Sequence, residues 1–151
     1  MKILVATEKP FAKKAVDGIR QIVEGAGYEL ALLEKYTDKS ELLSAVADVD
    51  ALIIRSDKVT AEVIEAARNL KIVVRAGAGY DNVDLAAATA RGIVVMNTPG
   101  QNSNAVAELA LAMMIFMARN GFTPGTGSEI QGKTLGIHAY GNVGRLVGRK
   151  G

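Results

Sequence analysis

The sequence has 151 residues, of which 49% are hydrophobic and 23% charged, and its formal net charge is +2. This composition excludes a disordered tail and fits an α/β domain with buried central strands, and so small a net charge predicts that the chain has no nucleic-acid partner. Because the chain contains no cysteine, no disulfide framework supports the fold, and a cytoplasmic location is expected. The longest apolar run, 109–118, is about half of what crosses a membrane, so no membrane partner is expected.

Five short apolar runs rich in β-branched residues predict strands that are buried on both faces. They lie at 3–6, 30–33, 52–54, 72–74 and 93–96. Between them, apolar residues at helical spacing predict helices over 11–23, 42–46 and 63–67, the third with Thr60 as N-cap, and over about 83–91, where Gly92 ends the pattern. This alternation predicts a flavodoxin-like, doubly wound parallel sheet over residues 1–102.

The pattern changes after residue 102. A helix over 103–119 is apolar almost all round, which predicts an inter-domain helix that must be covered on more than one side. A glycine-rich linker over 120–132 follows. Residues 133–151 then predict a second βα unit, with a strand at 134–139, a turn at 140–144 and a helix opening at Arg145 that the sequence leaves truncated.

Polar groups follow four of the five predicted strands, at 7–9, 55–56, 75–79 and 97–102. Ligands of open parallel sheets bind at the carboxyl ends of the strands, so these loops predict a site for a small anion bearing carboxylate or phosphate. The alternative is that the glycines make a tight turn and 97–99 caps a strand.

The turn at 139–144 has Ala139, Gly141 and Gly144 where the dinucleotide-binding fingerprint has three glycines. Alanine at the first position weakens this motif. His138 is the single histidine and is interpreted as a packing residue, the cluster of Arg145, Arg149 and Lys150 as a solvated end, and no metal-ligand spacing is present.

A resemblance to the D-2-hydroxyacid dehydrogenase family is found in the segments 75–84, 92–99, 102–109 and 132–137. Within this family, the sequence of these segments is most similar to that of the phosphoglycerate-oxidising members. The resemblance implies an NAD-dependent oxidoreductase of serine biosynthesis that acts on a small anionic 2-hydroxy or 2-oxo acid. It implies a Rossmann NAD-binding domain, of which 133–151 is the start. It also implies that the catalytic histidine, glutamate and arginine belong beyond Gly151, so that the chain alone is expected to be inactive.

Site residues follow from the resemblance position by position. Arg55 and Ser56 are expected to face the anionic end of the substrate, the N–H groups of 77–79 to hold its carboxylate, and Asn102 to contact it. The expected substrate-binding residues are thus Arg55, Ser56, Gly77, Ala78, Gly79 and Asn102. The expected cofactor-binding residues are Ala78, near the nicotinamide, and Gly141, Asn142, Val143 and Gly144, which cradle the pyrophosphate of NAD.

Two alternatives stay open. A glyoxylate or hydroxypyruvate reductase has the same family pattern, and the family also includes non-enzymatic, NAD-sensing co-repressors that bind peptides. In either case the apolar helix 103–119 is expected to be exposed and to favour a homo-oligomer. Residues from about 121 onward are expected to float or to find a non-native partner.

Overall fold

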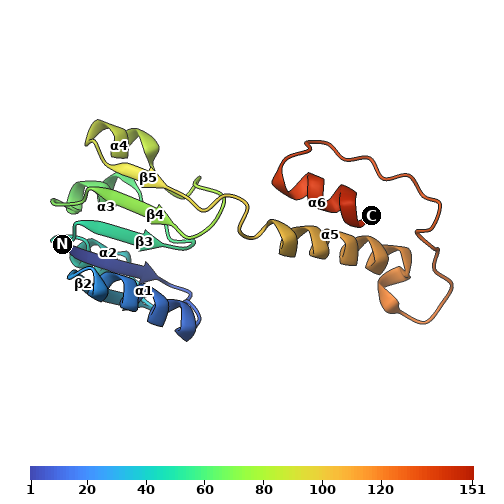
Figure 1. Cartoon of the computed structure of the whole chain (residues 1–151), viewed down its shortest axis with the longest axis horizontal. Helices are drawn as coiled ribbons and strands as arrows, with labels where there is room; N and C mark the ends of the chain where they lie inside the picture. Colours follow the sequence, from blue (N-terminus) through green and yellow to red (C-terminus); the bar gives the residue numbers. More distant parts are fainter. The chain divides into compact units, whose positions relative to one another are not determined.

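The computed structural model describes residues 1–151, which divide into two compact units, Met1–Thr98 and Pro99–Gly151 (Figure 1). The first unit contains one five-stranded sheet in the order β2-β1-β3-β4-β5, with every pair parallel. Its strands are β1 (Lys2–Thr7), β2 (Glu29–Glu34), β3 (Ala51–Ile54), β4 (Ile72–Arg75) and β5 (Val94–Met96). This order is the flavodoxin-like arrangement that the sequence predicts.

Four helices connect these strands, namely α1 (Lys13–Gly25), α2 (Lys39–Ala45), α3 (Ala61–Ala66) and α4 (Leu85–Ala90). Side chains of α2, α3 and α4 share one buried cluster with the strands, which includes Leu42, Val63, Ile64, Ala88, Leu52 and Ile54. The buried residues of α1, Val16 and Val23, are not in that cluster. Right-handed crossovers account for this division, because the β1–β2 connection runs across the sheet in the opposite direction from the other three.

The outer strands are more exposed than the sequence predicts. In β3 three of the four residues are buried, whereas β2 and β5 contain none that is fully buried. Val94 and Met96 of β5 are 56% and 52% exposed. The prediction of burial on both faces is therefore wrong for β2 and β5. Apolar composition alone does not distinguish the edge of a sheet from its centre.

Polar side chains define where the short helices begin. Asp38 forms a capping box with Glu41 at the start of α2, and Asp84 accepts a hydrogen bond from the N–H of Ala87 at the start of α4. The fourth helix therefore begins at Leu85 rather than Val83. Thr60 does occupy the N-cap of α3, but its side chain makes no capping hydrogen bond.

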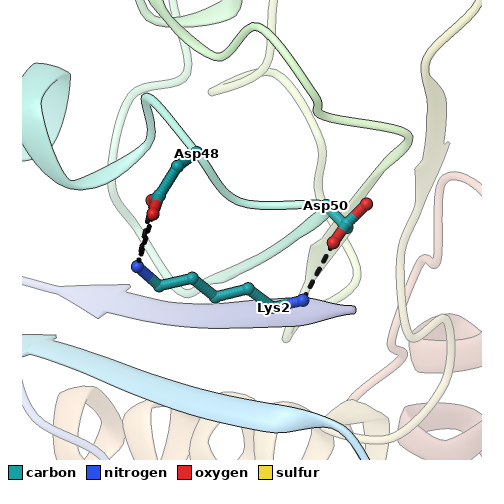
Figure 2. Close-up of polar contacts among 3 residues, drawn as sticks. All are labelled: Lys2, Asp48 and Asp50. Atoms are coloured by element: carbon teal, nitrogen blue, oxygen red, sulfur yellow. Dashed lines mark hydrogen bonds and ion pairs between the residues drawn. The ribbon is translucent and has the colours of Figure 1, made fainter.

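An ionic cluster joins the amino ends of the strands, at the edge of the sheet opposite the predicted site. Figure 2 shows the backbone nitrogen of Lys2 at Asp50 (2.9 Å) and the ammonium group of Lys2 at Asp48 (2.8 Å). The Lys71 ammonium group also donates to Asp50, at 2.7 Å. Asp50, just before β3, thus links the first residue of β1 to the residue that precedes β4.

Asp50 should make the stability of the chain depend on acid pH. The hydrogen bond from Lys71, and then that from the N–H of Lys2, hold the pKa of Asp50 below its usual value. A depressed pKa stabilises the folded state above the ordinary pKa of about 4, and this contribution is lost as the pH falls through the folded value. Urea unfolding at a series of pH values should show a shallower acid loss for Asp50→Asn than for the exposed-carboxylate control Asp17→Asn. Parallel profiles would contradict this role.

The second unit contains α5 (Ser103–Ala118), a 3-10 turn η1 (Asn120–Phe122) and α6 (Asn142–Lys150). Helix α6 packs against α5, with Val147 buried and Lys150 3.4 Å from Glu108. Of the two outcomes expected for residues beyond about 121, floating or finding a non-native partner, the first is therefore wrong for α6. None of the helices combines the length and the hydrophobicity that a membrane span requires.

Two predictions in this unit need correction. Residues 134–139 form no strand, because a strand requires a neighbour to complete its hydrogen bonds and the sheet contains no strand from this unit. The last helix begins at Asn142, one turn earlier than the predicted Arg145, because the glycine turn leads directly into it.

Candidate functional site

The carboxyl ends of β1 and β3 mark the point where the strand order of the first unit reverses. The connection after β1 runs to β2 on one side, and the connection after β3 runs to β4 on the other. In doubly wound sheets the loops separate at such a switch point and leave a crevice that binds ligands. The loops after Thr7 and Ile54 therefore border the expected position of a site.

A buried carboxylate holds these loops together. Asp57 is only 3% exposed, and its Oδ1 accepts hydrogen bonds from the N–H of Glu8 and the hydroxyl of Tyr36, both at 2.8 Å. Its Oδ2 accepts the N–H of Arg55 at 3.2 Å. Asp57 could not be identified from the sequence, because its partners Glu8 and Tyr36 come from distant segments.

Two neighbours complete this arrangement. Burial, and then the hydrogen bond to Asp57, raise the pKa of the Tyr36 hydroxyl well above its usual value, so Tyr36 remains a donor. The side-chain amide of Asn82 donates to the backbone carbonyl of Asp57 at 2.7 Å. Loops that follow β1, β2, β3 and β4 are thus joined through one residue.

Arg55 and Ser56 lie exposed beside Asp57, where the sequence places the anion-binding residues. The carbonyl of Arg55 accepts a hydrogen bond from Nε of Arg75, at 2.8 Å. A Cβ atom at Gly77 would lie 1.6 Å from Nη1 of Arg75, so glycine at this position leaves room for the guanidinium group. Arg75 begins one of the four loops that predict the anion site, although the resemblance assigned it no role, and it adds a second positive charge to this edge.

The loop 77–79 is held by hydrogen bonds from the two residues that follow β5. The carbonyl of Gly77 accepts the N–H of Thr98 at 2.9 Å, and the carbonyl of Ala78 accepts the Asn97 amide at 2.7 Å. The N–H of Gly77 donates to the carbonyl of Arg75, whereas the N–H groups of Ala78 and Gly79 have no such partner. Of the three predicted carboxylate donors, the last two remain free to bind a ligand.

The second unit contains the other predicted residues. Asn102 is the N-cap of α5, and its side chain makes no capping hydrogen bond. Gly141 is the N-cap of α6, and a Cβ atom there would meet nothing within 4 Å. At Gly144 a Cβ atom would lie 2.3 Å from the carbonyl oxygen of Ala139. The spacing of the fingerprint therefore matches its physical requirements, with close packing at Gly144 and open space at Gly141.

Ala139, at the first position of the fingerprint, has φ +74°, a left-handed conformation that favours glycine. This conformation destabilises the folded state of a residue with a Cβ by roughly 1–2 kcal/mol. Replacing alanine by glycine removes that strain, but it also makes the unfolded chain more flexible, which offsets roughly 0.4–1 kcal/mol of the gain. Ala139→Gly should therefore stabilise the second unit by roughly 0.5–1 kcal/mol. Hydrogen exchange of the α6 amides measures this change.

The control is the same exchange within α5. Ala112→Gly lies in the middle of that helix and should destabilise it by about 1 kcal/mol. If Ala139→Gly destabilises α6 as much as Ala112→Gly destabilises α5, the backbone of Ala139 is not strained.

A pocket of about 250 Å³ lies within the second unit, at the starts of α5 and α6. It is lined by Gly100, Ser103, Asn142, Arg145, Leu146 and Arg149. Arg145 donates to the Asn142 side chain at 2.9 Å and, through Nε, to the carbonyl of Gly141 at 3.3 Å. Arg145 and Arg149 are exposed, as expected of a solvated end, and both also line this pocket.

Comparison with known proteins covers nearly all of the chain. Residues 4–145 match the model of the D-isomer specific 2-hydroxyacid dehydrogenase catalytic domain. A crystal structure of NAD+-bound 3-phosphoglycerate dehydrogenase from Entamoeba histolytica is 54% identical, with a TM-score of 0.95, over 99% of this chain and 50% of that chain.

Two curated relatives have different names. Hydroxypyruvate reductase of Thermotoga maritima is 41% identical over 136 residues, and D-3-phosphoglycerate dehydrogenase of Archaeoglobus fulgidus is 40% identical over 164. They cover 81% and 99% of this chain. The chain spans 44% and 30% of their respective lengths.

Proposed function

The chain belongs to the D-isomer specific 2-hydroxyacid dehydrogenase family, and on this premise we propose that it is part of a D-3-phosphoglycerate dehydrogenase. Such an enzyme oxidises 3-phosphoglycerate to 3-phosphohydroxypyruvate with NAD and supplies serine biosynthesis in the cytoplasm. Residues 1–102 are proposed as the substrate-side domain and 133–151 as the beginning of the NAD-binding domain, with the helix 103–119 and the linker 120–132 between them.

The observation that carries this proposal is the cationic edge of the first unit. Arg55 is exposed beside the switch point, and Arg75 is hydrogen-bonded to its carbonyl. Guanidinium groups suit phosphate and carboxylate because they donate paired hydrogen bonds. Free N–H groups at Ala78 and Gly79 give the same edge donors for a carboxylate. A substrate with an anion at each end fits this set of donors.

NAD is the proposed cofactor, and the turn before α6 fits its pyrophosphate. Gly141 leaves open space for the approach of a phosphate, and the N–H groups of Asn142 and Val143 belong to the first turn of the nine-residue helix, where anions are favoured. Arg145 holds the Asn142 side chain beside that turn. When bound, NAD supplies the acceptor for the hydride of the substrate's hydroxyl-bearing carbon.

Calorimetric titration of the chain tests the substrate class. 3-Phosphoglycerate should bind roughly tenfold to a hundredfold more tightly than D-glycerate, which lacks the phosphate and its charge-assisted hydrogen bonds. Equal affinities, or preference for hydroxypyruvate, would favour the second candidate, a hydroxypyruvate reductase like the Thermotoga maritima relative. If the chain binds neither 3-phosphoglycerate nor hydroxypyruvate, both candidate functions are contradicted.

The chain alone should bind 3-phosphoglycerate but should not oxidise it. His138 is the single histidine of the sequence and is interpreted as a packing residue, and the family resemblance assigns the proton-exchanging histidine to none of the motifs matched here. An assay with 3-phosphoglycerate and NAD is expected to yield no NADH. Measurable turnover would show that a residue of this chain exchanges the hydroxyl proton.

The apolar surface of α5 is proposed to join two copies of the chain. Its residues Leu109, Met113 and Met117 are 60%, 55% and 77% exposed. Exposed apolar surface of this kind is typical of interfaces. Light scattering should give the mass of a homo-oligomer, and a monomeric mass would contradict this assembly.

A further inference from the structure

We infer that Asp57 is the positioning residue of the anion site, since its carboxylate fixes the loop that presents Arg55 and Ser56 to the substrate. This inference rests on the proposed function, because it assigns to Asp57 the geometry of the proposed phosphate-binding edge. Asp57 itself does not touch the substrate. Its buried side chain acts through the loops that it joins.

The hydrogen bonds of Asp57 go mainly to backbone. Its carboxylate accepts the N–H groups of Glu8 and Arg55, which belong to the two loops that separate at the switch point. Because these donors are main-chain groups, the hydrogen bonds determine the path of the chain at both residues. The backbone of Arg55 is therefore fixed by the buried Asp57 carboxylate, while the Arg55 side chain stays exposed.

Two further contacts keep the Asp57 carboxylate in place. The Tyr36 hydroxyl donates to the same oxygen as the N–H of Glu8, and the Asn82 amide donates to the Asp57 carbonyl. Each contact is between 2.7 and 2.8 Å and comes from the loop of a different strand. A buried carboxylate with three donors is satisfied by hydrogen bonds rather than by an ion pair.

The charge of Asp57 and its geometry have opposite effects on an anionic ligand. A carboxylate two residues from Arg55 repels the ligand, so removing its charge alone would tighten anion binding. Losing the hydrogen bonds frees the Arg55 loop and weakens binding, because the site must then be ordered on each association. The direction of the change in affinity therefore separates positioning from electrostatics.

The experiment compares Asp57→Asn with the unchanged chain in two measurements. The first is amide hydrogen exchange of Glu8 and Arg55 without ligand, and the second is calorimetric titration with 3-phosphoglycerate and with inorganic phosphate. Asparagine has the size of aspartate but turns an N–H2 group toward N–H donors. We expect faster exchange at Glu8 and Arg55 and affinity for both anions that is about tenfold weaker.

Two controls accompany this variant. Asp17→Asn, on the exposed face of α1, removes the same charge but no hydrogen bond to either loop, and should leave both measurements nearly unchanged. Tyr36→Phe keeps the charge and both backbone hydrogen bonds but removes one donor, so it should weaken binding about threefold. Tyr36→Phe also keeps the inference testable if Asp57→Asn does not fold.

The outcomes distinguish the inference from the proposed function. Unchanged exchange at Glu8 and Arg55, or anion binding that tightens in Asp57→Asn, would overturn the positioning role. An unchanged affinity in Tyr36→Phe would do the same. If the unchanged chain binds neither anion, the proposed function fails, and the positioning of an anion by Asp57 fails with it, even where the exchange result shows that Asp57 orders the loops.

Discussion

Gly144→Ala should both loosen α6 and abolish most cofactor binding. The added Cβ atom would lie 2.3 Å from the carbonyl oxygen of Ala139 and 3.3 Å from Cγ2 of Ile137. Because the nearer atom belongs to the backbone, either the turn or the helix must move. Such overpacking costs about 1–3 kcal/mol. NADH fluorescence titration should show at least about tenfold weaker binding, and the α6 amides should exchange faster.

Gly141→Ala is the matched control for this prediction. A Cβ atom at Gly141 meets nothing within 4 Å, so the fold should keep its stability. The methyl group would nevertheless occupy the space through which the pyrophosphate approaches the backbone, so NADH binding should weaken. The two alanines should therefore reduce affinity alike and differ in stability. If Gly141→Ala binds NADH normally, the turn is not the pyrophosphate site.

Arg55→Gln should weaken the binding of 3-phosphoglycerate by roughly tenfold to a hundredfold. Glutamine keeps much of the length and polarity of arginine but loses the charge and the forked donors. A hydrogen bond to a charged group contributes about 1.5–3 kcal/mol, which corresponds to this loss of affinity. Since the Arg55 side chain is exposed, thermal unfolding should change little. Calorimetric titration measures the affinity.

The control for Arg55 removes one positive charge elsewhere. Arg68→Gln, exposed in the turn before the amino end of β4 and thus at the opposite edge of the sheet, changes the net charge of the chain by the same amount. Its affinity for 3-phosphoglycerate should stay within about twofold, because exposed charges that are distant from the ligand are screened by salt. If both variants lose the same affinity, the effect belongs to the net charge and Arg55 is not a contact.

The sheet could be predicted because its information is local. Each strand of the first unit is a short apolar run between helices, and this alternation determines a parallel, doubly wound sheet. What the runs do not encode is their place in the sheet. The predicted runs at 30–33 and 93–96 are as apolar as the run of β3, so their position at the edges became visible only in three dimensions.

The missed features depend on contacts distant in sequence. Residues 134–139 have the composition of a strand, yet strand formation is decided by pairing. Asp57 reads as an ordinary loop residue after Arg55 and Ser56, because its partners Glu8 and Tyr36 lie 49 and 21 positions away. By contrast, the fingerprint does indicate that position 144 requires glycine, since the turn and the helix that meet there are adjacent in sequence.

The backbone character of the Asp57 contacts bears on how this site can change during evolution. Glu8 and Arg55 meet the carboxylate through their N–H groups, which any residue other than proline possesses. Mutations at these two positions can alter the chemistry presented to the ligand while the supporting network persists. Tyr36 and Asn82 contribute side-chain atoms and have no such freedom. Substrate preference and the stability of the supporting network therefore depend on separate residues, so substrate preference can change during evolution while the network is kept.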